Sequence, residues 1–329
     1  MTWATPQEFN GRWFKPCKGG TFCNLLYTIL EVHRLPRSYS QKKTAGKTYL
    51  IFKKMPRIHV NQTELYYEER GKGAETLVFS HGLLWSSLMF ADQVAHFKDR
   101  YRIIAYDHRG QGQSAVPAEG YDMDTLTEDV RALLDALNVD RCHFAGLSMG
   151  GFVGLRLASR YPELVQSLVL MDTSAQAEPE ANIPRYQILN GVVSILGAWA
   201  VKRPVMKIMF APGFLQDPNR KALKRKWEKE LTRNSRTITR AVKGVIEREG
   251  VPPDALSQIT CPTLVLVGEE DVATVPAKSA YLAEHIPNAK LIHIPRAGHT
   301  SSVEEPEAVC RAMEAFLDGP LEDYRGLVL

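Results

Sequence analysis

Ser148 stands between two glycines in the stretch Gly146-Leu147-Ser148-Met149-Gly150, which fits the pattern G-x-S-x-G. A serine hydroxyl becomes a useful nucleophile when a nearby imidazole takes its proton and backbone N–H groups receive the oxyanion that forms. The two glycines permit a sharp strand-to-helix turn, because a β-carbon at either place would crowd it. The spacing therefore predicts a nucleophile, Ser148, on a tight turn.

A serine nucleophile needs a base and an acid that orients the base. Asp271 follows a strand predicted over Thr263–Val267, and His299 follows one predicted over Lys290–Ile294. The order Ser, Asp, His along the chain differs from the His-first and Asp-first orders of other serine hydrolases. Asp172 is an alternative acid, because it too follows a predicted strand.

Strands and helices alternate along most of the chain around these residues. Short apolar or alternating runs predict strands, and longer runs with apolar residues at helical spacing predict helices. The remaining strands are expected at Arg57–Val60, Glu64–Glu69, Thr76–Ser80, Tyr101–Tyr106 and Ser167–Met171, and in the apolar run before Ser148. Helices are expected near Ser87–Phe97, over Met123–Leu137, after Ser148, and over Ala277–His285 and Pro306–Leu317. This order predicts an α/β fold with a mostly parallel central sheet and helices on both faces.

The alternation divides the chain into four parts. We expect an N-terminal extension at 1–54, a first core part at 55–175, an inserted helical cap at 176–256, and a second core part at 257–329. The cap is predicted because its apolar clusters have helical spacing and are separated by Pro204, Pro212 and Pro218. Ligand groups gather at the carboxyl ends of strands in such sheets, where the candidate residues fall.

Charge is unevenly distributed, although the net charge is only +4. Residues 1–54 carry ten Lys/Arg against two Asp/Glu, and residues 176–256 carry fifteen against eight. The basic stretch Arg220–Lys229 could contact nucleic acid, but apolar Leu223, Trp227 and Leu231 at four-residue spacing favour an amphipathic helix with a solvated charged face. We therefore expect no nucleic-acid partner.

Residues 1–54 are basic and poor in acids, and no strand can be identified among them. They lack the compact apolar core and small-residue end of a cleavable signal peptide. A transit peptide is one interpretation; an extension upstream of Met55 that is non-native or disordered is the other. No apolar run approaches the roughly 20 residues that span a bilayer, and the five cysteines have no metal-site spacing. We expect a cytoplasmic protein that has no membrane-spanning segment, no membrane partner and no metal site.

Five signatures now stand in order between Met55 and Leu317. They are His81-Gly82, the D-x-R-G-x-G-x-S run Asp107–Ser114, GLSMG, the G-x-x-D-x-x-x-x-P run Gly268–Pro276, and Gly298-His299. Through them the chain resembles the α/β-hydrolase fold family. It looks most like its small bacterial esterases and lactonases, which include enol-lactonases and acyl-homoserine-lactone lactonases.

The resemblance implies roles for the candidate residues. Ser148 would be the nucleophile, His299 the general base and then acid, and Asp271 the carboxylate that orients the imidazole. Backbone N–H groups of Leu83 and Met149 would form the oxyanion hole. From the sequence itself, Trp85, Met206, Met209, Phe210 and Phe214 are expected to line an acyl pocket beneath the cap, with plain core packing as the alternative.

Other polar residues have ordinary explanations. His81 is expected to hold the loop of Leu83, and Asp107 and Arg109 to form turn and salt-bridge contacts. Gly110 and Gly112 favour a turn over a phosphate cradle, because the third glycine of that motif is missing. His143 and His293 lie within strand patterns, so we expect packed residues there.

The expected reaction is hydrolysis of small-molecule carboxylic esters and of lactones, with N-acyl-homoserine lactones as candidates, through an acyl-enzyme and without a cofactor. Dehalogenation is disfavoured, because that chemistry in this fold uses Asp where this chain has Ser148. Three alternatives stay open: a cofactor-free perhydrolase, a carbon–carbon hydrolase on the same triad, and a small-molecule receptor with slow turnover.

Overall fold

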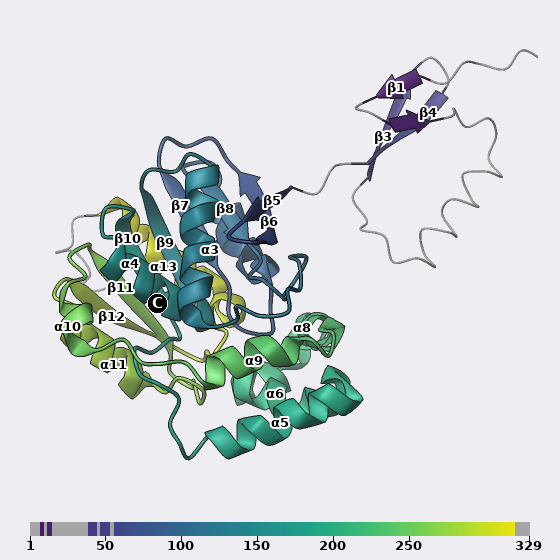
Figure 1. Cartoon of the computed structure of the whole chain (residues 1–329). Helices are drawn as coiled ribbons and strands as arrows, with labels where there is room; N and C mark the ends of the chain where they lie inside the picture. The colour runs from purple at the N-terminus through teal and green to yellow at the C-terminus, as the bar shows by residue number, and fades with distance from the viewer. Residues whose placement is uncertain (1–6, 10–11, 15–38, 45–46, 53–55, 320–329) are drawn as a thin grey trace, which may run out of the picture. The chain divides into compact units, whose positions relative to one another are not determined.

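The computed structural model describes residues 7–9, 12–14, 39–44, 47–52 and 56–319 (Figure 1). The chain forms two compact units, Met1–Pro56 and Arg57–Leu329. In the first unit, β1 (Gln7–Phe9) pairs antiparallel with β2 (Arg12–Phe14), and β3 (Tyr39–Thr44) with β4 (Lys47–Phe52). The expectation that residues 1–54 contain no strand is wrong for these four stretches. The rest of residues 1–55 lies outside the described residues.

The second unit is built on an eight-stranded sheet with the order β12-β11-β10-β9-β7-β8-β6-β5. Its strands are β5 (Arg57–Val60), β6 (Thr63–Arg70), β7 (Thr76–Ser80), β8 (Arg102–Tyr106), β9 (Cys142–Leu147), β10 (Val165–Met171), β11 (Thr263–Gly268) and β12 (Ala289–Ile294). The pairs from β8 to β12 are parallel, whereas β5 and β6 form an antiparallel hairpin at one edge. The predicted α/β fold and mostly parallel sheet are confirmed.

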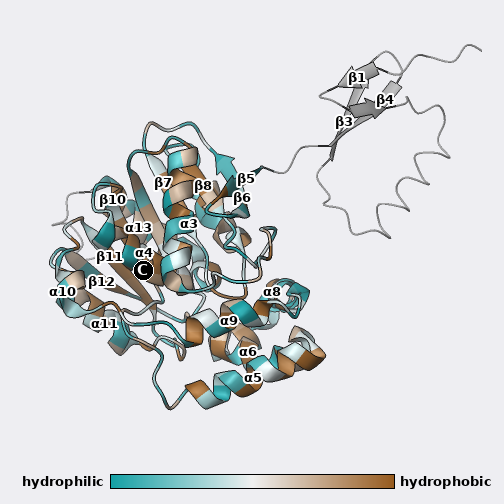
Figure 2. Ribbon diagram, viewed as in Figure 1, coloured by the Kyte–Doolittle hydropathy of each residue, from teal (hydrophilic) through white to brown (hydrophobic). Residues whose placement is uncertain are grey.

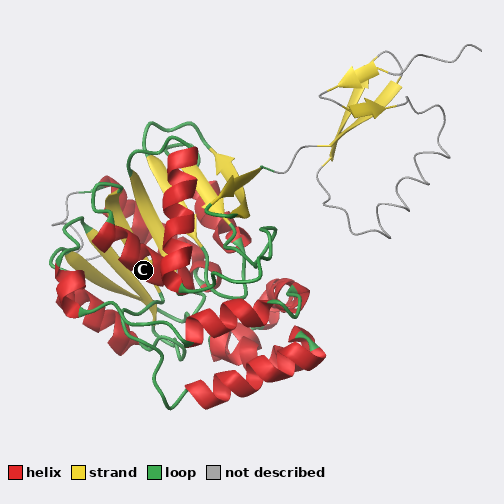
Figure 3. Ribbon diagram, in the orientation of Figure 1, coloured by secondary structure: helices red, strands yellow, loops and turns green. Residues whose placement is uncertain are grey.

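Helices cover both faces of this sheet (Figure 3). They are the 3₁₀ helix η1 (Ser87–Phe90), α2 (Ala91–Phe97), α3 (Met123–Ala136), α4 (Met149–Arg160), α10 (Pro253–Ser257), α11 (Pro276–His285), α12 (Ser301–Glu304) and α13 (Pro306–Asp318). Among the described residues, none of the helices is long and apolar enough to cross a membrane.

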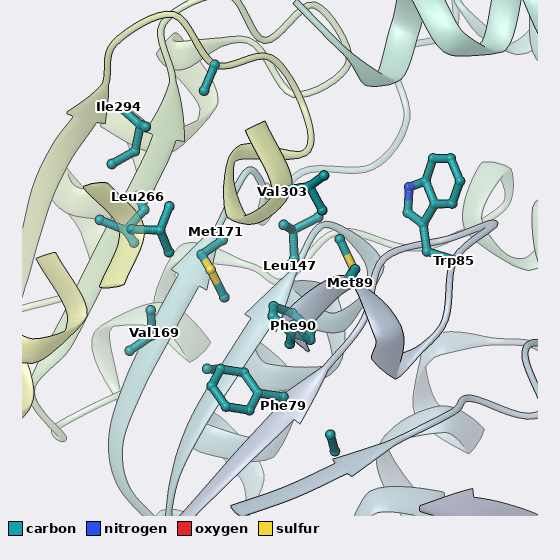
Figure 4. Packing of buried hydrophobic residues seen from close by; sticks show 14 of the residues in the cluster. Phe79, Trp85, Met89, Phe90, Leu147, Val169, Met171, Leu266, Ile294 and Val303 are labelled. Atoms are coloured by element: carbon teal, nitrogen blue, oxygen red, sulfur yellow. The ribbon is translucent and has the colours of Figure 1, made fainter. Parts of the chain in front are cut away.

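The strands alternate their side chains between two hydrophobic clusters. On β7, Leu77 and Phe79 enter one cluster, which also holds Phe97 of α2 and Met313 of α13. Val78 between them enters the other cluster, with residues of α3, α4 and α11. This period of two is what a strand imposes. The central strands are accordingly hydrophobic in Figure 2, and Figure 4 shows the packing of the first cluster around Phe79 and Phe90.

The inserted segment between β10 and α10 is helical, as predicted. Its elements are α5 (Ile183–Leu196), η2 (Ala198–Val201), α6 (Lys202–Met209), α7 (Pro212–Gln216), η3 (Pro218–Arg220), α8 (Lys221–Arg233) and α9 (Ile238–Ile246). The three prolines expected to separate helices lie at the starts of helices, each in a first turn: Pro204 in α6, Pro212 in α7 and Pro218 in η3. Proline is tolerated there because a first-turn N–H has no helical partner.

The two ends of this cap meet where they join the core. Val251 N–H donates to the carbonyl of Ala175 at 2.7 Å, and Arg248 forms a buried ion pair with Glu178 at 3.0 Å. One backbone hydrogen bond and one ion pair therefore clasp the start of the cap to its end.

Candidate active site

Ser148 lies on the tight turn between β9 and α4. Its φ of +51° is in the left-handed region, which non-glycine residues rarely adopt and which clusters at functional sites. A β-carbon on Gly146 would come 2.3 Å from the carbonyl oxygen of Gly150, and one on Gly150 would come 2.0 Å from that of Ser80. Glycine is required at both positions, because backbone atoms cannot move away cheaply. The predicted strand-to-helix turn is therefore present.

His299 reaches Ser148 from the loop after β12. Its Nε2 lies 2.8 Å from Ser148 Oγ, and its Nδ1 lies 2.9 Å from Asp271 Oδ2. An ionised carboxylate only accepts hydrogen bonds, so Nδ1 carries the proton and Nε2 accepts from the Ser148 hydroxyl. Asp271 and His299 are 3% and 4% exposed, and Ser148 is 9% exposed. The fold thus brings together three residues that are 28 to 151 positions apart.

The environment keeps Asp271 ionised. Burial by itself raises the pKa of Asp271, but the charge and hydrogen bond of His299 and the N–H and hydroxyl of Thr274 lower it below its usual range overall. Ala273 N–H and Thr274 N–H donate to Oδ1 at 2.8 and 2.9 Å, and the Thr274 hydroxyl donates to Oδ2 at 2.7 Å. Such donors favour the charged form of a carboxylate.

The same pairing favours the protonated form of His299. Burial lowers the pKa of this imidazole, but the neighbouring carboxylate of Asp271 raises it more, so the pKa lies above its ordinary value. A base with a raised pKa accepts a proton from a serine hydroxyl more readily. Ser148, His299 and Asp271, the three predicted catalytic residues, therefore lie at hydrogen-bonding distances from one another in that order.

Asp172, the alternative acid, lies close by but has different partners. It accepts from Gly268 N–H at 2.8 Å and from the N–H and hydroxyl of Ser301 at 3.1 and 2.5 Å. Burial, and then the charge of Asp271, raise its pKa to about 7. Its hydrogen bonds connect the ends of β10 and β11 to the segment after His299. In the described part of the structure, Asp172 therefore has structural contacts and none of them is with the imidazole.

The loop after β7 supplies an N–H group beside Ser148. A β-carbon on Gly82 would lie 3.4 Å from Ser148 Cβ, so this loop runs against the serine. Gly82 N–H donates to Met89 Sδ at 3.4 Å, Leu84 N–H to Gln111 Oε1 at 2.8 Å, and Trp85 N–H to the Gly82 carbonyl at 3.4 Å. Within the described part of the chain, the N–H of Leu83 has no such partner. It is therefore available to an oxyanion.

Met149 N–H is the second predicted donor. Met149 is the first residue of α4, and the first N–H groups of a helix have no partner within the helix. Across the described residues, no hydrogen-bond acceptor contacts this N–H either. The helix N-terminus also carries a partial positive charge that favours an anion. Both predicted oxyanion donors are thus unpaired.

A cavity of about 130 Å³ lies above these residues, with Ser148 and His299 in its wall. The cap provides most of the remaining wall with aliphatic side chains, including Val193 of α5, Val205 and Ile208 of α6, and Ile238, Val242 and Ile246 of α9. The site therefore opens into an apolar space that fits a hydrocarbon chain.

The predicted lining of this cavity needs correction. Met209 is part of the wall, but Trp85, Met206, Phe210 and Phe214 are not. These four side chains are buried in the first hydrophobic cluster, where Trp85 packs edge-on against Phe210 and Trp227, and Phe210 stacks on Phe214. Figure 4 shows Trp85 in this cluster with Met89. They join cap to core, because the three aromatic rings and the Met206 side chain fill the space between the two.

A buried ion pair and a buried glutamate were not found by the sequence analysis. Glu178 and Arg248 line the cavity as an ion pair. Glu304 accepts hydrogen bonds from Gly298 N–H, Thr300 N–H and the cap's Ala211 N–H at 3.0, 3.2 and 2.8 Å. The sequence gives little indication of either, because a buried glutamate or arginine cannot be told from an exposed one by residue type alone.

His81 and His143 have structural contacts, whereas His293 on β12 is exposed, so the expectation that it is packed is wrong. His81 Nε2 accepts from His108 N–H at 2.9 Å, and its Nδ1 lies 2.7 Å from the Gly82 carbonyl, so it holds the loop of Leu83 as expected. His143 Nδ1 contacts Ser167 Oγ at 2.8 Å. Among the described residues, no group of three or more His, Cys, Asp or Glu side chains is arranged to hold a metal ion.

The cap helix α8 has the amphipathic character that its spacing predicts. Trp227 and Leu231 are buried, and Leu223 packs partly against the same cluster. Lys221, Arg225, Lys226 and Lys229 on the same helix are exposed. Arg220 instead binds the core, through Glu305 Oε1 at 2.8 Å.

Several known proteins are similar to this chain in sequence or in fold. It is 34% identical over 242 residues to 3-oxoadipate enol-lactonase 2 of Acinetobacter baylyi, covering 73% of this chain and 88% of that protein. It is 32% identical to RutD of Pseudomonas syringae pv. syringae, a protein for which carbamate hydrolase activity has been proposed. The match covers 74% of this chain and 94% of that protein. The solved structure of Est816, described as an N-acyl homoserine lactone degrading enzyme, superposes with a TM-score of 0.68 at 27% identity, covering 79% and 100%.

A family model described as the alpha/beta hydrolase fold matches residues 75–306, a span that contains Ser148, Asp271 and His299. That span also contains the parallel sheet and the whole inserted cap. On this match, together with the geometry above, the chain belongs to the α/β hydrolase family of enzymes.

Proposed function

We propose that this enzyme hydrolyses carboxylic esters and lactones through an acyl-enzyme on Ser148. The observation that carries the proposal is the pair of contacts at His299, 2.8 Å to Ser148 Oγ and 2.9 Å to Asp271 Oδ2, at the wall of an apolar cavity. This is the geometry that a serine nucleophile and its base require.

In the acylation step, Ser148 Oγ attacks the carbonyl carbon of the substrate while Nε2 of His299 takes the hydroxyl proton. The carbonyl oxygen becomes an oxyanion, which the N–H groups of Leu83 and Met149 stabilise. The tetrahedral adduct then collapses, the bond to the leaving oxygen breaks, and Nε2 returns the proton to that oxygen. Asp271 stabilises the imidazolium throughout.

In the deacylation step, a water molecule replaces the alcohol. His299 takes a proton from the water as it attacks the acyl carbon, and returns it to Ser148 Oγ when the ester bond breaks. The product is a carboxylic acid. A lactone follows the same steps, except that its leaving hydroxyl stays tethered to the acyl group, so the product is a hydroxy acid.

The size of the cavity supports short to medium acyl groups. An engineered apolar cavity of about 150 Å³ in another protein holds benzene, so about 130 Å³ corresponds to roughly six carbons or fewer. Each methylene buried here contributes about 0.8 kcal/mol until the space is filled. The names of two similar proteins, an enol-lactonase and an N-acyl homoserine lactone degrading enzyme, support lactones as a substrate class.

The test is a substrate panel. We expect multiple turnover on p-nitrophenyl esters of graded chain length, and acid release in a pH-stat from N-acyl-homoserine lactones. A small-molecule receptor would instead stall after about one equivalent. If esters turn over while lactones of every acyl length release no acid above the buffer rate, a carboxylesterase without lactonase activity remains. Absence of hydrolysis of both classes would exclude the proposal and favour carbon–carbon or perhydrolase chemistry.

A further inference from the structure

Leu84, directly after the candidate oxyanion donor Leu83, has a strained backbone. Its φ is +75°, in the left-handed region, although it is not a glycine. Such a conformation persists only when the surroundings fix it, and it clusters at functional sites. The contacts that fix it here come from two different parts of the molecule.

The first contact comes from the core. Gln111, in the loop after β8, is 3% exposed, and its Oε1 accepts from Leu84 N–H at 2.8 Å. Its Nε2 lies 3.7 Å from Met149 Sδ. Gln111 therefore touches the residue after one predicted oxyanion donor and the side chain of the other.

The second contact comes from the cap. Asn234 follows α8, and its Nδ2 donates to the Leu84 carbonyl at 2.8 Å and to the Leu231 carbonyl at 3.0 Å. The amide group of Asn234 thus links the end of a cap helix to the loop beside Ser148. Neither Asn234 nor Gln111 is among the residues that line the cavity.

These contacts fix both peptide planes of Leu84. Gln111 holds the plane before its α-carbon through the N–H, and Asn234 holds the plane after it through the carbonyl. On the other side of Leu83, Met89 Sδ accepts from Gly82 N–H at 3.4 Å. The peptide that carries the Leu83 N–H is therefore bracketed by held neighbours.

We propose that Gln111 and Asn234 are positioning residues that aim the Leu83 N–H at the oxyanion, so that the cap supports the transition state through a backbone contact. This inference rests on the proposed function, because it assumes an oxyanion at Ser148. It adds that the cap contributes to kcat as well as to substrate fit, since a donor is useful only where the oxyanion forms.

The experiment compares Asn234→Ala, Asn234→Asp and Gln111→Met with the wild-type chain on a butyrate ester. Asn234→Asp keeps the shape but offers the Leu84 carbonyl an acceptor instead of a donor. Ser235→Ala, the adjacent exposed residue, is the matched control. A butyl trifluoromethyl ketone, which forms a tetrahedral oxyanion on a serine, serves as the transition-state probe, and thermal melting checks folding.

We expect kcat to fall on the order of 10- to 100-fold in both Asn234 variants, less than for complete removal of an oxyanion donor, with KM within about twofold. The affinity for the ketone should fall by the same factor. Gln111→Met should act in the same direction, and the double variant should lose less than the product of the single losses, because both act on one loop.

Unchanged kcat and ketone affinity in Asn234→Ala and Asn234→Asp would overturn the inference, even if Gln111→Met fails to fold. A loss confined to KM would also overturn it, because it would place Asn234 in substrate binding. If the wild-type chain hydrolyses no ester, or Ser148→Ala hydrolyses as well as wild type, the proposed function itself fails, so the two failures are distinguishable.

Discussion

Burial, and then the charge of Asp271, raise the pKa of Asp172, and of these two neighbouring carboxylates Asp271 is the one that contacts His299. Two carboxyl groups in one buried region cannot both ionise cheaply. The hydrogen bonds resolve this competition: the donors around Asp271 and the imidazole keep it charged, and Asp172 titrates at about 7. The two residues that the sequence could not separate are thus separated by their partners.

Replacing each acid should give unequal losses. Asp271→Asn removes the charge that holds His299 in its useful tautomer and should lower kcat by up to about 10⁴. Asp172→Asn should cost far less, because Asp172 contacts Ser301 and Gly268 and not the imidazole. Steady-state kinetics on one ester measure both, with melting curves as the folding control. The reverse ranking would transfer the role to Asp172.

Removal of the nucleophile tests the whole assignment. Ser148→Ala should fold normally and lower kcat by a factor on the order of 10³ or more, because His299 has no hydroxyl left to activate. Ser257→Ala, on the short helix α10, is the matched control and should keep full activity. Near-normal hydrolysis by the Ser148 variant would refute a serine mechanism.

The activity should depend on pH through His299. Only the neutral imidazole can accept the serine proton, and Asp271 raises the pKa of His299 above its ordinary value. As pH falls through that raised pKa, kcat/KM should decrease, so the acid limb lies at higher pH than an unperturbed histidine would give. In Asp271→Asn the residual acid limb should move to lower pH, because the stabilising charge is gone. An unmoved limb in kcat/KM profiles would assign it to another group.

The cavity beneath the cap should determine how kcat/KM depends on acyl length. Each added methylene should raise kcat/KM about fourfold, from about 0.8 kcal/mol, until roughly six carbons. Val193→Phe places a larger side chain in the part of the wall that α5 forms, which narrows the cavity. The acyl length with the highest kcat/KM should therefore become shorter. Trp85 does not line the cavity, so Trp85→Leu should lower the melting temperature without changing the preferred acyl length. A length profile that follows Trp85 and ignores Val193 would contradict the cavity assignment.

Glu304 should matter for stability. It is 1% exposed and satisfies three backbone N–H groups, one from the cap and two beside His299. Each buried donor left unpaired costs about 1–3 kcal/mol, so Glu304→Leu should lower the free energy of unfolding by about 3 kcal/mol or more. Urea unfolding compares it with Glu307→Leu, an exposed position in α13. Equal effects would show that the hydrogen bonds of Glu304 contribute nothing.

A chain that begins at Met55 should keep its melting temperature and specific activity. The catalytic candidates, the sheet and the cap all fall within the second unit, Arg57–Leu329. Among the described residues of the first unit, β1 pairs with β2 and β3 pairs with β4. Loss of soluble protein on truncation would show that residues 1–54 stabilise the rest of the chain.

The sequence predicted what depends on local pattern. The apolar run before Ser148 and the glycines around it dictate a buried strand and a tight turn, so the serine's place at a strand end followed directly. Asp271 and His299 could be placed because they too follow strands, and parallel strands end at one edge of the sheet.

Contacts between distant segments could not be predicted in this way. Met206 and Met209 lie one helical turn apart in α6, yet Met209 lines the cavity whereas Met206 is buried in the first hydrophobic cluster. Gln111 and Asn234 hold Leu84 across 27 and 150 positions of sequence. A polar residue in a loop gives no sign of so distant a partner.

The hydrogen bond between Ala175 and Val251 means that the cap departs from and returns to the core at one point. A segment joined in this way can change length or sequence at small entropic cost, because loop closure depends only weakly on loop length. Substrate range could therefore evolve by exchange of this one continuous segment, with the Ser148 turn left untouched. In this protein the cap also offers a donor to the Leu84 carbonyl and an N–H to Glu304, and an exchanged segment that offers neither would leave both acceptors without those partners.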